Sequence, residues 1–157
     1  MKKIFLLVAF IATAFVQQSF AQDSTKTQPS LLLTSYYSLK DALVSSNAGT
    51  ASASAAEFIK SLNGIGKEII NEEIRNALLN DAAAISQTKE LKLQREKFAT
   101  LSANMFAAAK KIKLSTEPVY LQYCPMKKAS WLSNNKAIKN PYYGNAMLTC
   151  GSVKETL

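Results

Sequence analysis

The stretch LLLTSYYSLKDALVSSNAGTASASAAEFIKSLN, residues 31–63, determines the fold that we expect for this chain. Its first half places large apolar side chains at spacings of three and four, namely Leu32, Tyr36, Leu39 and Leu43. That period is typical of an amphipathic helix, and we predict one over about residues 30–46. Asn47 and Gly49 suit a helix end, and Thr50 suits the N-cap of a second helix that begins at Ala51.

The same helical period continues to Leu114 without a proline. Breaks at residues 63–66 and 86–88 divide this region into a third helix with apolar positions from Ile69 to Ile85 and a fourth from Leu91 to Ile112. Four amphipathic segments joined by short links predict a mainly all-α fold, an antiparallel helical bundle of about four helices over residues 31–114.

The last forty or so residues, 115–157, differ in character from the helical region. The sequence Val119–Tyr123 alternates and is rich in aromatic and β-branched side chains, so it predicts a short strand. The rest holds prolines, glycines, the single Trp and both Cys, which favours a loop-rich C-terminal appendix. Irregular segments with unusual residues often carry function, so we look for a site here.

The N-terminus has the pattern of a secretory signal peptide. Lys2 and Lys3 precede an apolar run from Ile4 to Val16 that is too short to span a bilayer, and small residues end at Ala21. We expect a cleaved signal peptide over 1–21, a flexible leader over 22–30 and a single domain over 31–157. The mature protein is then periplasmic, with no stable membrane anchor.

Composition excludes several classes of function. The 157 residues contain no His and two Cys, so one chain cannot form a Ser-His-Asp or Cys-His triad or a four-cysteine zinc site. We therefore expect no enzymatic activity and no catalytic residues. Loss of Lys2 and Lys3 lowers the net charge from +8 to +6, and the remaining lysines are scattered, so we expect no nucleic-acid partner.

Four sulfur-bearing residues of the appendix form the candidate site. They occur as two close pairs, Cys124 with Met126 and Met147 with Cys150. Thiolate and thioether ligands select Cu(I) over hard cations, and Ag(I) suits them equally, so these four residues are the predicted metal ligands. An alternative stays open, because two cysteines of an exported domain often form a disulfide. A Cys124–Cys150 bond would close a loop of about 27 residues and stabilise the fold by about 3–4 kcal/mol.

Longer motifs surround these sulfur residues. They comprise Tyr123-Cys124-Pro125-Met126, Trp131-Leu132-Ser133, Ile138-Lys139-Asn140-Pro141-Tyr142-Tyr143-Gly144 and Met147-Leu148-Thr149-Cys150-Gly151. Together with Tyr37–Val44 and Phe98–Ser102, they make the chain resemble an exported bacterial family known as domain of unknown function 3347. Members of that family occur free-standing or fused to CusB-type adaptors of heavy-metal efflux systems.

The resemblance implies a periplasmic helical domain that handles copper or a related metal. The leading hypothesis is a chaperone, buffer or sensor for heavy-metal efflux, whose partner is an efflux adaptor or another periplasmic protein. The alternative is a non-catalytic interaction module, in which a Cys124–Cys150 disulfide locks the C-terminal loop. In that alternative Trp131, Tyr142 and Tyr143 form the surface for a partner protein.

Overall fold

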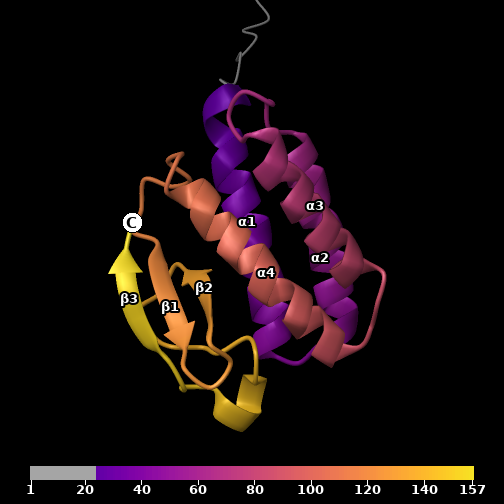
Figure 1. The fold of residues 1–157 in the computed structure, drawn as a ribbon, viewed down its shortest axis with the longest axis vertical. Helices are drawn as coiled ribbons and strands as arrows, with labels where there is room; N and C mark the ends of the chain where they lie inside the picture. The colour runs from indigo at the N-terminus through magenta and orange to yellow at the C-terminus, as the bar shows by residue number, and fades with distance from the viewer. Residues whose placement is uncertain (1–23) are drawn as a thin grey trace, which may run out of the picture.

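The computed structural model describes residues 24–157, and the predicted signal peptide lies outside them. Four helices come first along the described chain: α1 (Ser24–Val44), α2 (Ala48–Asn63), α3 (Glu72–Ser86) and α4 (Leu91–Ala109). They are followed by β1 (Tyr120–Cys124), β2 (Ala129–Ser133), the short 3-10 helix η1 (Gly144–Met147) and β3 (Ser152–Thr156). The mainly helical fold expected from the sequence is confirmed (Figure 1).

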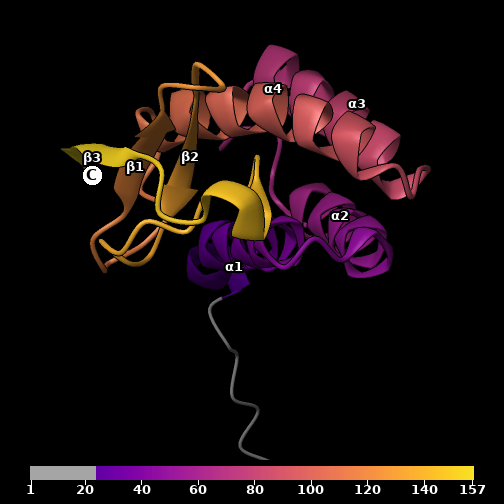
Figure 2. The same cartoon turned by 90° about the horizontal axis from the view of Figure 1, so that it is seen from below.

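The helices lie in two layers beside the sheet. Figure 2 shows α1 and α2 in one layer and α3 and α4 in the other. Each helix packs against the next along the chain, and α4 also packs against β2. The core between them is formed by fully buried side chains, the largest of which include Tyr36, Phe58, Phe98 and Trp131. The C-terminal segment is therefore part of the same core as the helices.

The sheet corrects our expectation for the C-terminal segment. We predicted one short strand in a loop-rich appendix, whereas the structure has three antiparallel strands in the order β2-β1-β3. The predicted strand is the central one, β1, which pairs Leu121 with Leu132 of β2 and with Glu155 of β3. The outer strands escaped prediction because neither Ala129–Ser133 nor Ser152–Thr156 shows a clear apolar alternation.

The helix boundaries differ from those expected in two places. Helix α1 begins at Ser24, within the segment that we expected to be a flexible leader, and continues through Pro29. The polar composition of this first part gave no apolar period to detect. The second helix is capped by Asn47 rather than Thr50, since the Asn47 side chain accepts a hydrogen bond from the Thr50 N–H at 2.9 Å. Asn is among the best N-cap residues for this reason.

Two buried polar side chains fix the ends of the helices. The Gln94 amide of α4 donates to the carbonyl oxygens of Ala48 and Thr88 at 3.0 and 2.8 Å, so it joins the start of α2 to the turn before α4. Arg75 of α3 donates to the Leu62 carbonyl at 2.7 Å, where α2 ends. Because buried polar groups are costly without partners, these bonds specify how the helices meet.

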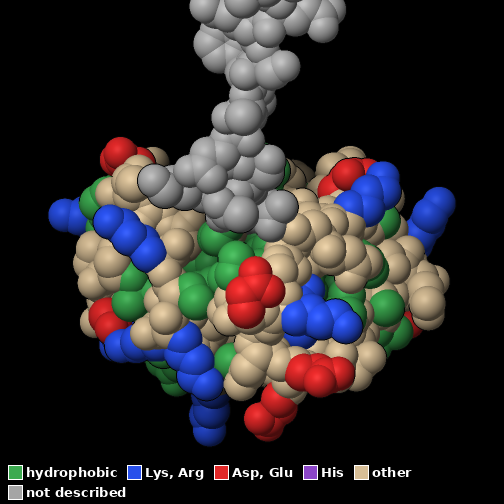
Figure 3. Space-filling model, turned by 90° about the horizontal axis from the view of Figure 1, so that it is seen from above, with side chains coloured by type: hydrophobic (Ala, Val, Ile, Leu, Met, Phe, Trp, Pro, Cys, Tyr) green, Lys and Arg blue, Asp and Glu red, His purple; other side chains and the backbone are tan. Residues whose placement is uncertain are grey.

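The charged surface shows no single dominant sign on the face drawn in Figure 3. Lysine or arginine side chains alternate there with acidic ones. Among the described residues, no helix combines the length and the apolar composition that crossing a membrane requires.

The Tyr36 hydroxyl joins α1, α4 and β2 at the centre of the molecule. Its oxygen lies 2.7 Å from the Ser102 hydroxyl and accepts the Leu132 N–H at 3.1 Å. Burial raises the pKa of Tyr36 well above its usual range, so the hydroxyl stays neutral. The neighbouring Tyr37 differs, because its buried hydroxyl has no hydrogen-bond partner.

We expect Tyr36→Phe to lower the free energy of unfolding by about 1–3 kcal/mol, because it leaves a buried N–H and a buried hydroxyl without their partner. Tyr37→Phe is the matched control and removes no bond, so it should leave stability unchanged or slightly raised. Urea denaturation of both variants measures the difference. Equal stability of the two variants would contradict the role that we assign to Tyr36.

Candidate functional site

The two cysteines lie at the same end of the sheet although 26 positions separate them in the chain. Cys124 is the last residue of β1, and Cys150 comes two residues before β3 begins. β1 and β3 are antiparallel neighbours, with Tyr123 opposite Ser152. Figure 1 shows the end of β1, the β1–β2 turn and η1 together at the lower end of the molecule. The topology therefore brings the two sulfur-bearing segments to one place.

Cys124 is completely buried, and a tight turn covers its sulfur. β2 pairs with β1 immediately beyond it, with Ala129 opposite Cys124, so residues 125–128 form the connecting turn. Lys128 adopts a left-handed backbone conformation there, with φ of 53°. The Lys127 N–H donates to the Cys124 sulfur at 3.4 Å.

Cys150 is half-buried beside Cys124. The pKa of Cys150 is raised by desolvation, by the charge of Cys124 and by a hydrogen bond with the Cys124 side chain, in that order. The pairing of Tyr123 with Ser152 and this electrostatic interaction both place the two thiols near each other, as both the metal hypothesis and the disulfide hypothesis require. Both cysteines are free in this structure.

Gly151 lets the Cys150 segment approach the sheet this closely. Its φ is 152°, and a Cβ atom at this position would lie 2.9 Å from the Tyr123 carbonyl oxygen and 3.0 Å from the Trp131 ring. The contact of 2.9 Å is shorter than a Cβ atom tolerates and that of 3.0 Å is very tight, so only glycine fits here without a shift of the neighbouring atoms.

The two methionines are less closely held than the cysteines. Met147 ends η1 and is half-buried, and its carbonyl accepts the Cys150 N–H at 3.1 Å. Met126 lies in the β1–β2 turn and is 63% exposed. Of the four predicted ligands, the structure thus brings the two cysteines to the same end of neighbouring strands and places the methionines in the segments that carry them.

Asn140 organises the loop that carries Met147 and Cys150. This side chain is completely buried, its amide donates to the Cys150 carbonyl at 2.8 Å, and its oxygen accepts the Tyr142 N–H at 2.9 Å. Its backbone N–H donates to the Leu148 carbonyl at 2.8 Å. In the sequence, Asn140-Pro141 is only part of a longer motif, because the burial of the Asn140 amide depends on how its own loop folds back to Cys150.

A second set of contacts fastens this loop to the helices. Arg95 of α4 donates to the Pro141 carbonyl at 3.0 Å and to the Leu43 carbonyl of α1 at 3.1 Å. Gly144 lies beside this contact in the left-handed region of backbone conformation, with φ of 55°. A Cβ atom on Gly144 would lie 2.7 Å from the Ser46 hydroxyl oxygen, so the close approach also requires glycine.

The aromatic residues that the interaction hypothesis placed on a surface are mostly buried. Trp131 is completely buried and Tyr142 is 4% exposed, so neither is available to a partner, and this part of the hypothesis is wrong. The Tyr142 ring packs against Phe98 of α4 and against Trp131, and its hydroxyl donates to the Ser130 carbonyl. Within residues 24–157, the buried Trp131 indole N–H has no hydrogen-bond partner.

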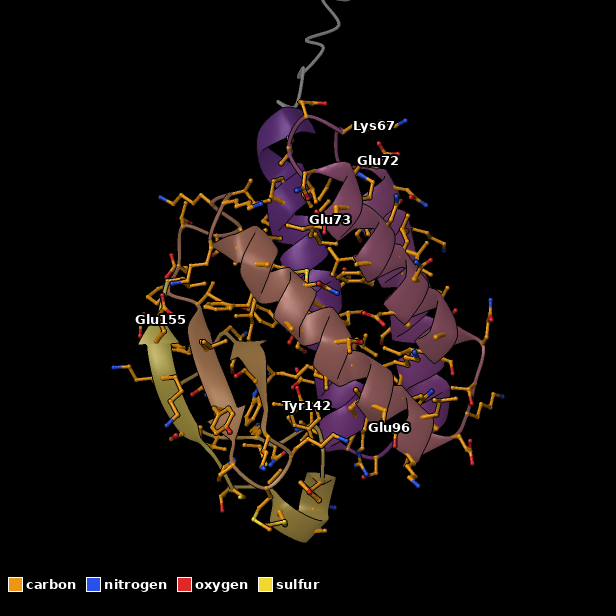
Figure 4. The ribbon with its side chains drawn as sticks, in the orientation of Figure 1. Lys67, Glu72, Glu73, Glu96, Tyr142 and Glu155 are labelled. Carbon is orange, nitrogen blue, oxygen red and sulfur yellow. The ribbon has the colours of Figure 1, made fainter. Side chains whose placement is uncertain are left out.

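Carboxylates do not gather into a second site among the described residues. Figure 4 shows Glu72 and Glu73 near Lys67 at one end of the molecule, Glu96 toward the other end of the helices and Glu155 on the sheet. Within residues 24–157, no three His, Cys, Asp or Glu side chains are grouped so that they could hold a metal ion. The cysteine pair is therefore the arrangement on which a chemical role can be argued.

We expect Asn140→Ala to lower the free energy of unfolding by about 2–4 kcal/mol, because it leaves the Cys150 carbonyl and the Tyr142 N–H without their buried partner. It should also increase the rate at which a thiol reagent modifies Cys150, since the loop is released. Asn145→Ala, at an exposed position of η1, is the control and should change neither. Identical thiol reactivity in the two variants would show that Asn140 does not hold this loop.

The comparisons with known proteins identify a family. The family model described as "Protein of unknown function (DUF3347)" matches residues 32–117, which is more than half of the chain. No curated protein and no solved structure gives a significant match. The matched region spans the helices and stops just before the sheet that carries the cysteines. The chain therefore belongs to the DUF3347 family of proteins of unknown function.

Proposed function

We propose that this protein binds a soft monovalent metal ion, Cu(I) or Ag(I), through the neighbouring thiols of Cys124 and Cys150. The observation that supports the proposal is the sheet register: Cys124 ends β1, Cys150 comes just before the neighbouring strand β3, and Tyr123 lies opposite Ser152. Two sulfur ligands are enough to coordinate a Cu(I) ion. Such soft ligands bind Cu(I) in preference to magnesium, calcium and manganese ions.

Metal binding would replace the protons of the two thiols. Each thiol loses one proton, and the two thiolates then coordinate one cation, so one bound Cu(I) releases two protons. The Lys127 N–H, which already donates to the Cys124 sulfur at 3.4 Å, would stabilise the negative charge on that ligand. Met147 and Met126 would supply additional thioether ligands, with Met147 favoured because it lies in the same loop as Cys150.

The rest of the molecule would act as a scaffold in this proposal. The four helices, as an antiparallel bundle, hold the sheet and the loop through Tyr36 and Arg95. The protein would be non-catalytic and exported to the periplasm after removal of residues 1–21. There it would serve as a chaperone, buffer or sensor linked to heavy-metal efflux, with an efflux adaptor or another periplasmic protein as its partner and no nucleic acid.

A second candidate function rests on the same placement of the two cysteines. Neighbouring thiols also suit a Cys124–Cys150 disulfide, which would make the protein an interaction module with a locked C-terminal loop. The two proposals differ in the state of the native protein. Titration of free thiols after mild reduction separates them: two free thiols per chain favour the metal site, and none favours the locked module.

The reduced protein should bind one Cu(I) per chain in competition with a chromophoric Cu(I) chelator. The double variant Cys124→Ser with Cys150→Ser should lose this binding, because serine hydroxyls are hard ligands. Met147→Leu should weaken binding by about tenfold, and Met126→Leu by less. Each variant is first compared with the native protein by circular dichroism, so that loss of fold is not taken for loss of ligands.

Met105→Leu is the matched control, since Met105 is completely buried in α4 and the change preserves volume. It should leave Cu(I) binding unchanged. If the folded double serine variant binds Cu(I) as well as the native protein, the proposed site is wrong.

A further inference from the structure

The two outer edges of the sheet differ in how their backbone groups are satisfied. Toward the helices, the Leu132 N–H of β2 donates to the Tyr36 hydroxyl, and the Ser130 carbonyl accepts from Tyr142. Helix α4 also packs against β2. The edge of the sheet formed by β2 is thus closed by side chains and by a helix.

The edge formed by β3 is open. Four of its five residues are exposed, and Figures 1 and 2 show no described element on the far side of β3. Leu157 and Val119 exchange backbone hydrogen bonds of 2.8 and 3.2 Å, so Leu157 faces β1. Because successive residues of an antiparallel strand alternate in direction, the N–H and C=O of Thr156 point to the open edge. Such groups can pair with an added strand.

A pocket lies where this open edge ends. It has a volume of about 540 Å³ and is lined by residues 109–119, which connect α4 to β1, and by Thr156 and Leu157. This volume is in the range of sites that accommodate a bound group. Its wall includes apolar surface from Ile112 and Leu114. A chain added along β3 would run directly into this pocket.

Lysines dominate the charge around this surface. The pocket wall carries Lys110, Lys111 and Lys113 against one acidic side chain, Glu117, and β3 carries Lys154 beside Glu155. The Glu155 carboxylate is paired with the Lys110 amine, so it does not offset the remaining lysines. Lysines on an edge strand disfavour pairing with a second copy of the same strand, because the like charges would meet. They attract a strand of opposite charge.

We propose that β3 is a docking edge for an extended, acidic segment of a partner protein, which adds a fourth strand to the sheet and places a side chain in the pocket at residues 109–119. Main-chain hydrogen bonds along β3 would provide the affinity, and the lysines and the pocket would provide the selectivity. The segment would span about five residues, or roughly 16 Å of strand.

The docking edge also leads to the cysteine pair. β3 begins two residues after Cys150, at the end of the strand opposite the pocket. A partner strand along β3 would therefore bring the partner to the thiols. The proposal does not depend on metal binding, however, and its test uses protein without added metal. Failure of the docking edge and failure of the metal site are thus distinguished.

The test maps the backbone amide shifts of the purified protein on addition of a peptide of about eight alternating valine and glutamate residues. We expect shifts confined to Ser152–Leu157 and to residues 110–119. Thr156→Pro removes the outward N–H without removing a bond to β1, and proline is tolerated at such edge positions. It should weaken binding by about tenfold, whereas the control Thr156→Val, which keeps the N–H, should not.

The role of charge is tested separately. The double variant Lys111→Glu with Lys113→Glu should also weaken peptide binding by about tenfold. A peptide with lysine in place of glutamate should not bind. Equal binding of the lysine peptide, shifts away from β3 and the pocket, or no effect of Thr156→Pro would each overturn the proposal. So would sedimentation showing that the protein alone dimerises through β3.

Discussion

The outer edge of β2 is closed by two tyrosine hydroxyls, and the position of the whole sheet depends on this constraint. Tyr36 reaches from α1 to the Leu132 N–H, and Tyr142 returns from the following loop to the Ser130 carbonyl. Both rings lie against Phe98 of α4, so the same side chains fill the core and satisfy the strand. Because a buried backbone group without a partner is costly, few other placements of the sheet are open to this sequence.

This placement explains how a small sheet brings two distant cysteines together. β1 is the central strand and ends at Cys124, and the chain returns through the Asn140 loop to Cys150 before it pairs with β1 again as β3. Asn140 holds the loop from within, Arg95 fastens it to α1 and α4, and Gly151 permits the final approach. The helices that match the family model and the sheet beyond it are thus joined by specific polar contacts.

The helices could be predicted because their signal is local: apolar side chains at spacings of three and four, with Asn and Gly between them. The strand at β1 was found by alternation for the same reason. The outer strands could not be found in this way, since Ser152–Thr156 is an exposed edge whose pairing depends on β1. The cysteine pair was predicted from two sequence segments. Its supporting residues were not, because Arg95 acts through partners far along the chain and Asn140 acts through the fold of its own loop. The interaction hypothesis placed Trp131 and Tyr142 on a surface, whereas both are buried in the core.

The central claim is that Cys124 and Cys150 together form the coordination site of a soft metal ion. X-ray absorption spectroscopy of the Cu(I)-loaded protein tests this most directly, because it reports which elements are bound to the copper. The account predicts a coordination shell of sulfur alone, which is lost in the folded double serine variant. A shell of oxygen or nitrogen, or a sulfur shell that survives the loss of both cysteines, would contradict it.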